Sequence, residues 1–170
     1  MGSLVTIGLK KIEIAPLASD GGPGTVFTAF GNISTDSFSF AEAEPNVKQV
    51  DIEESSAPLK IFKTKGNLVI NANIADADAD MYATVRGGTV TSATGKKTYK
   101  EGSTVANVER TVRITPEEGL VFTINRCDIS GLLNGGLGKN QELFLALTLT
   151  ALQPKKAGVD IFEAEETVPV

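Results

Sequence analysis

The chain has 170 residues, with 16 basic against 21 acidic side chains, a formal charge of −5 and no histidine. The acidic balance disfavours a protein that grips nucleic acid through a basic face, because neutralised phosphates supply most of that affinity. The absence of histidine removes the commonest general base and metal ligand. The length fits a single domain, residues 1–170, with a core of its own.

Apolar and polar residues alternate along most of the chain, which predicts β-strands. The first strand is expected over 5–14, with a bulge near Lys10 or Lys11, where the alternation changes phase. ASDGGPG, residues 18–24, has the composition of a turn. VFTAFGNIS and TDSFSFAEAE then predict two strands that form a hairpin around a tight turn at residues 34–36.

The next stretch, residues 42–57, loses apolar density, gains acidic residues and contains a proline. We expect a long excursion there, part extended and part loop. LKIFKTKGNLVINANIA, residues 59–75, is again predicted as strand and runs directly into a group of closely spaced aspartates.

Three aspartates stand at alternate positions in NIADADADMYATVRGG: Asp76, Asp78 and Asp80. The spacing begins like a calcium loop, but the loop's glycine and its bidentate glutamate are missing from the expected positions. A strand-to-helix junction accounts for more residues, with Asp76 or Asp78 as the cap of a short helix and acidic side chains in its first turn. Gly87 and Gly88 then end the helix.

Further along, the lysine-rich residues 89–106 predict an exposed, mobile hairpin or flap. ANVERTVRIT and GLVFTINRCDIS predict a second hairpin, joined by a turn at residues 116–119. GLLNGGLGKN, residues 131–140, holds four glycines in ten, and NGGLG within it, residues 134–138, is expected to be a flexible turn. QELFLALTLTAL predicts a strand near the centre of the sheet. Residues 154–170 form an acidic C-terminal tail that either packs on a neighbour or stays disordered.

The predicted fold is therefore mainly β, an antiparallel β-sandwich or barrel with one short flanking helix and a long protruding loop. Its single cysteine, Cys127, lies in an apolar strand pattern and is expected to be buried rather than reactive. No complete phosphate-binding loop or dinucleotide fingerprint is present, and the carboxylate pairs Glu53-Glu54 and Glu117-Glu118 lie in polar, turn-like contexts. We expect no enzyme, no metal site and no cofactor.

The order of these elements carries a resemblance to a known family. GLKKIEIAP opens the chain, FGNISTDSFSFAEAE and the acidic excursion follow, GNLVINANI leads to ADMYATVRGG, and ELFLALTLTALQP is a late strand. The order resembles that of the tail tube proteins, or major tail proteins, of long-tailed bacteriophages, which share their fold with the tubes of contractile tails and type VI secretion.

The resemblance implies a structural virion protein that forms stacked, hexameric rings. Such rings build a hollow tail tube through which double-stranded DNA leaves the capsid without specific binding. The implied partners are further copies of the chain, a tape-measure protein and a tail terminator, and no membrane. The implied location is the virion tail, after synthesis in the bacterial cytoplasm.

The family offers no catalytic residue to carry over, but it matches two segments. Residues 78–88 match its helix, and residues 42–57 match a loop that reaches a neighbouring subunit or ring. The candidate assembly residues in this loop are Glu42, Glu44, Val47, Val50, Ile52, Glu53 and Glu54. Residues 89–106 have no clear counterpart. The alternative function is a monomeric β-sandwich binding module of the adhesin or carbohydrate-binding type.

Overall fold

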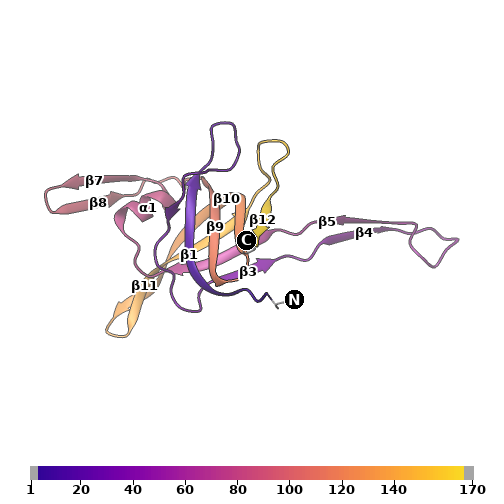
Figure 1. The fold of residues 1–170 in the computed structure, drawn as a ribbon, viewed down its shortest axis with the longest axis horizontal. Helices are drawn as coiled ribbons and strands as arrows, with labels where there is room; N and C mark the ends of the chain where they lie inside the picture. The colour runs from indigo at the N-terminus through magenta and orange to yellow at the C-terminus, as the bar shows by residue number, and fades with distance from the viewer. Residues whose placement is uncertain (1–3, 167–170) are drawn as a thin grey trace.

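The computed structural model describes residues 4–166 and is dominated by one antiparallel sheet (Figure 1). The order of its main path is β2-β1-β9-β10-β11-β6-β3, and β12 also pairs with β10. The strands of this sheet are β1 (Ile7–Pro16), β2 (Thr28–Ala29), β3 (Ser39–Glu42), β6 (Leu68–Ile74), β9 (Val108–Glu118), β10 (Val121–Gly138), β11 (Gln141–Ala151) and β12 (Phe162–Glu165).

Residues 28–34 bring the two ends of this sheet together. Phe30 donates its N–H to the Ile12 carbonyl of β1 at 2.9 Å, while Ser34 donates to the Asn73 carbonyl of β6 at 2.8 Å. One short segment thus bonds to β1 and to β6, which are each the second strand from an end of the path. The predicted β-sandwich or barrel is confirmed as an antiparallel sheet curved around one core.

The predicted hairpin around residues 34–36 is wrong, although the turn exists. Ser37 donates to the Ser34 carbonyl at 3.2 Å, and Asp36 adopts a positive φ of 57°. The flanking strands pair elsewhere, β2 with β1 and β3 with β6. Each of the two short strands pairs with a longer strand of the main sheet. The hairpin was mispredicted because alternation in sequence does not determine which strand a given strand pairs with.

The interior is filled by inward-facing side chains of the central strands. Leu145, Leu147 and Leu149 of β11 are at most 2% exposed and lie opposite residues of β6. Each fully buried side chain of this size contributes about 1.5–3 kcal/mol through removal from water. The predicted central position of this strand is confirmed, because β11 lies between β10 and β6.

The predicted bulge in the first strand is confirmed as a register shift between Leu9 and Lys11. The second predicted hairpin, β9–β10, also forms, but Pro116 to Glu118 belong to β9 rather than to a turn. β1 pairs with these residues, Leu9 opposite Pro116, and so keeps them extended after their pairing with β10 has ended.

The strand predicted over residues 59–75 is two strands. β5 (Lys60–Thr64) pairs with β4 (Asn46–Val50) outside the main sheet, and β6 begins only at Leu68. The flexible turn predicted for residues 134–138 is also wrong. β10 continues to Gly138, because β11 pairs with it as far as Gln141.

The helix α1 (Ala79–Arg86) confirms the predicted strand-to-helix junction. Asp78 is its N-cap and accepts a hydrogen bond from the Met81 N–H at 2.8 Å. Gly87, with φ at 75°, donates to the Ala83 carbonyl and ends the helix, and Gly88 also has a positive φ of 96°. Val85 anchors the helix in the core at 1% exposure.

The other two aspartates have partners of their own. Asp76 accepts hydrogen bonds from the backbone and side-chain nitrogens of Asn32, at 2.8 and 2.6 Å, and so joins the end of β6 to residues 28–34. Asp80 forms an ion pair with Lys97. Within residues 4–166 no cluster of three aspartate, glutamate or cysteine side chains is arranged to hold a metal ion.

Part of the predicted acidic tail belongs to the main sheet. β12 pairs with Val121 to Ile124 of β10, so the tail packs on its own chain as far as Glu165. Residues 167–170 lie outside the described part of the chain.

Candidate assembly surface

The most prominent feature of the surface is a long β-hairpin, formed by β4, β5 and the loop between them, which we call the arm. It extends from the body along the longest axis of the molecule (Figure 1). Its strands pair in register from Asn46 opposite Thr64 to Val50 opposite Lys60. Leu59 then donates to the Val50 carbonyl at 2.8 Å and extends the ladder toward the tip.

Local sequence explains where the arm begins and ends. Ala43 donates its N–H to the Asn67 carbonyl at 2.9 Å, which joins the two sides of the base. Gly66 packs so closely there that a Cβ would overlap the Ala43 carbonyl oxygen. Pro45 directly precedes β4, and Pro58 lies in the loop between β4 and β5. At these positions neither proline has to donate a hydrogen bond between strands.

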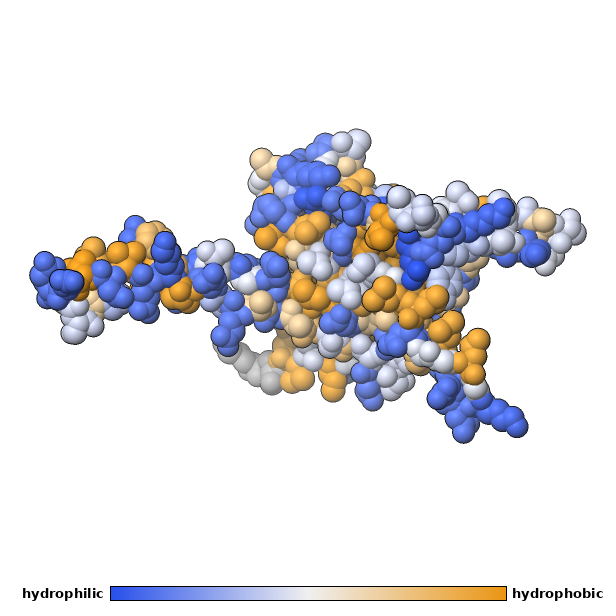
Figure 2. Space-filling view, turned by 180° about the vertical axis from the view of Figure 1, so that it is seen from behind, coloured by the Kyte–Doolittle hydropathy of each residue, from blue (hydrophilic) through white to orange (hydrophobic). Residues whose placement is uncertain are grey.

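Every residue from 39 to 65 is exposed, including several large apolar ones. The exposed fractions lie between 37% and 67% for the apolar residues Val47, Val50, Ile52, Leu59, Ile61 and Phe62. Figure 2 shows these apolar residues as an orange band along the arm, which projects to the left in that view. Isolated exposed apolar residues are ordinary, but a group on one projecting element marks an interaction surface.

The apolar side chains occupy both faces of the arm. Residues opposite each other in an antiparallel pair share a face, so Val47 and Ile61 lie on one face and Val50 and Phe62 on the other. Lys60 stands over the Phe62 ring, 4.7 Å from its centroid. Because neither face packs on the body, residues 4–166 leave the apolar side chains of both faces partly exposed.

The predicted assembly residues fall on or beside this arm. Val47 and Val50 lie in β4, while Ile52, Glu53 and Glu54 lie in the tip. Glu44 lies at the base, and Glu42 belongs to β3 in the main sheet. Leu59, Ile61 and Phe62 also lie on the arm but were not among the predicted assembly residues. The lysines at 60, 63 and 65 could have indicated that this strand is exposed, because lysine is rarely buried in a strand that is covered on both faces.

A second hairpin projects from the opposite side of the body. β7 (Thr89–Ala93) and β8 (Lys96–Lys100) confirm the hairpin predicted within residues 89–106. Arg86 of the helix anchors its base, donating to both carboxylate oxygens of Glu101 at 2.8 and 3.0 Å. The hydrogen bond to Glu101 raises the pKa of Arg86 above its ordinary value.

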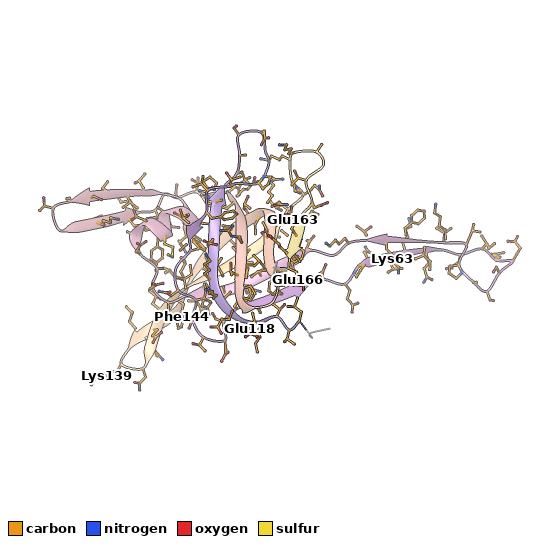
Figure 3. All side chains as sticks on the ribbon, in the orientation of Figure 1. Lys63, Glu118, Lys139, Phe144, Glu163 and Glu166 are labelled. Atoms are coloured by element: carbon orange, nitrogen blue, oxygen red, sulfur yellow. The ribbon has the colours of Figure 1, made fainter. Side chains whose placement is uncertain are left out.

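A third projection is the shared end of β10 and β11, where Leu132, Leu133 and Leu137 are 70%, 55% and 86% exposed. Figure 3 places Lys139 at this end and Lys63 on the arm, on different sides of the body. The residues predicted to form a flexible turn therefore belong to an extension of two strands of the main sheet.

An open groove of about 780 Å³ lies between β1 and residues 29–40. Phe38, Phe40 and Phe122 form its aromatic side, with ring centroids 5.2 and 5.5 Å apart. Its ionisable side chains are Lys10, Lys11, Asp36 and Glu117.

Outside the groove, burial raises the pKa of the Cys127 thiol to about 12, so that cysteine is not an activated nucleophile.

Comparison with protein-family models gives no match, and comparison with curated proteins gives no similar sequence. Within residues 4–166 no helix is long and apolar enough to cross a membrane.

Proposed function

We propose that the protein is a structural subunit that assembles with copies of itself into stacked rings, and that the rings form a phage-type tail tube. The observation that carries this proposal is the arm. All its residues are exposed, and six large apolar side chains on it are between 37% and 67% exposed. A monomeric protein gains nothing from such an element, whereas an assembling subunit can bury it against a neighbour.

Two further features support assembly. The strand β3 pairs with β6 on one side, and its other edge is free of pairing within the described residues. In a ring, such an edge can be covered by the next subunit. The net charge of −5 also suits a conduit for DNA, because like charge prevents adhesion to the wall. The ring number of six follows from the family resemblance.

Sedimentation velocity over a concentration series tests the proposal. The expected result is a concentration-dependent shift from the single-chain mass of 17.8 kDa to discrete rings and then to fast-sedimenting tubes. A single 17.8 kDa species at every concentration, in both low and physiological salt, would contradict self-assembly.

The aromatic groove favours a second candidate, a monomeric binding module. An open groove of about 780 Å³ with three phenylalanines is within the size range of small-ligand sites. This candidate predicts a strict monomer and saturable binding in a glycan or small-ligand screen. Neither property is expected of the tube subunit.

A further inference from the structure

Two exposed segments of the chain carry opposite charge. The tip of the arm, residues 51–59, contains Asp51, Glu53 and Glu54 and no basic residue. The β7–β8 hairpin, residues 89–100, contains Lys96, Lys97 and Lys100 and no acidic residue. Figure 1 shows the arm and the hairpin at opposite ends of the longest axis of the molecule. One chain therefore cannot bring its own tip to its own hairpin.

The hairpin holds its lysines in a defined arrangement. Tyr99 stacks on Tyr82 of the helix with ring centroids 5.7 Å apart, and Lys97 pairs with Asp80 at the start of the helix. Because side chains alternate along a strand, Lys96 and Lys100 lie on the opposite face of β8 from Tyr99 and Lys97. We call this the lysine face.

The charges on the lysine face and on the tip are available to a partner. Lys96 and Lys100 are exposed, and neither forms an ion pair within residues 4–166. The same is true of the three acidic side chains of the tip. By contrast, some charged groups of the main sheet are already paired, such as Glu109 with Arg126 at 2.6 Å and Glu13 with Arg113 at 2.9 Å.

We propose that the acidic tip of the arm of one copy docks on the lysine face of the β7–β8 hairpin of a second copy. Each copy then has one donor surface and one acceptor surface, at opposite ends. A heterologous contact of this kind propagates from copy to copy and closes a ring where the rotation permits. The inference rests on the proposed self-assembly and names the surfaces that perform it.

A second copy fits the lysine face better than DNA does. Tight phosphate binding needs many neutralised contacts, typically 6–10 in strong complexes, whereas this hairpin offers three lysines and no arginine on a chain with a net charge of −5. The lysine face presents two unpaired lysines, Lys96 and Lys100, and the tip supplies three carboxylates, so each of these lysines can pair with a carboxylate. Opposite charge at a rim chiefly sets the rate and the specificity of association.

Charge reversal on each surface gives a direct test. The hairpin variant carries Lys96→Glu and Lys100→Glu, and the tip variant carries Glu53→Lys and Glu54→Lys. Exposed ion pairs change an equilibrium constant by up to about fivefold each. Two lost pairs replaced by repulsion should therefore raise the concentration for half-assembly by about tenfold to a hundredfold in either variant alone.

Mixing the two variants separates a lost contact from a damaged fold. In an equimolar mixture every contact is complementary again, because the acidic hairpin meets the basic tip and the native hairpin meets the native tip. The mixture should assemble near the wild-type concentration in sedimentation velocity, with rings in which the two variants alternate. Lys155→Glu with Lys156→Glu is the control of equal charge change on exposed lysines outside the arm, the hairpin, the groove and the β10–β11 projection.

Each other outcome overturns the inference in a recognisable way. Wild-type-like assembly of both variants, or failure of the mixture while each variant stays folded by circular dichroism, would refute the contact. Normal assembly of the hairpin variant with loss of DNA retention on a filter would assign the lysines to DNA instead. A wild-type protein that stays monomeric would reject the proposed self-assembly as well, and so is distinguishable from failure of the contact alone.

Discussion

Removing the arm should abolish assembly and leave the fold intact. The cleanest perturbation replaces residues 45–65 with Asn-Gly, which favours a two-residue hairpin turn. The backbone bond from Ala43 to the Asn67 carbonyl, 2.9 Å long, already holds the two sides of the base together. The replacement therefore needs no new approach of the chain.

The size of the effect on assembly follows from the apolar side chains that the arm exposes. Six of them are between 37% and 67% exposed, and full burial of such a side chain contributes about 1.5–3 kcal/mol. Burial of the exposed half contributes about 1 kcal/mol each, or about 6 kcal/mol per arm. Loss of that contact corresponds to about a 10⁴-fold weaker association.

The effect on folding should be small, because every residue from 45 to 65 is exposed. Exposed substitutions change the unfolding free energy by about 0.5 kcal/mol or less, and a shorter connection adds about 0.6 kcal/mol of stability per halving of its length. Urea unfolding checks this expectation and sedimentation velocity checks assembly.

A matched pair of point variants keeps the arm but changes its surface. Ile61→Lys should weaken assembly, whereas Gln49→Lys, which lies directly opposite Ile61, removes no apolar contact and should act much less. Tubes from the deletion variant at wild-type concentration, or a loss of several kcal/mol in its stability, would refute this reasoning about the arm.

Three further predictions concern the body. Asp78→Ala should lower the unfolding free energy by about 1 kcal/mol through loss of the helix cap, and a large stabilisation of the wild type by added calcium, measured as a shift in Tm, would contradict the capping role. Burial opposes ionisation of Glu13, but the hydrogen bonds and charges of Lys11 and Arg113 outweigh it and hold the pKa of Glu13 below its ordinary 4.5. The contribution of ionised Glu13 to the unfolding free energy is therefore present above pH 4.5 and is lost as the pH falls through the folded pKa. Glu13→Gln should lower the unfolding free energy by about 1–2 kcal/mol near neutral pH and by less at pH values well below 4.5. Urea titrations at several pH values measure this difference. Cys127, with its pKa raised to about 12, should react with a thiol reagent only on unfolding; rapid labelling of the native protein would contradict its burial.

Local signals in the sequence were sufficient for the elements whose partners are close in the chain. The capping aspartate and the glycine at the end of the helix predicted its bounds, and the phase change near Lys11 predicted the bulge. Both depend on a few neighbouring residues and on backbone geometry. Such features can be inferred without knowing the fold.

Long-range pairing could not be predicted in the same way. β2 and β3 are neighbours in sequence but pair with strands at opposite ends of the sheet. β5 carries adjacent apolar residues, Ile61 and Phe62, and stands just before the core strand β6 in sequence, yet it pairs with β4 away from the body. Alternation fixes which side chains share a face and leaves the partner strand open, so the return strand of the arm and the extension of β10 were both mispredicted.

The most direct test of the account is electron microscopy of the purified protein after concentration, with averaged end-on views of the particles. Self-assembly through the arm predicts rings with an open centre, of six-fold symmetry by the family resemblance, and stacks of these rings at higher concentration. Compact particles of single-chain size at every concentration, with no ring in any view, would contradict the central claim.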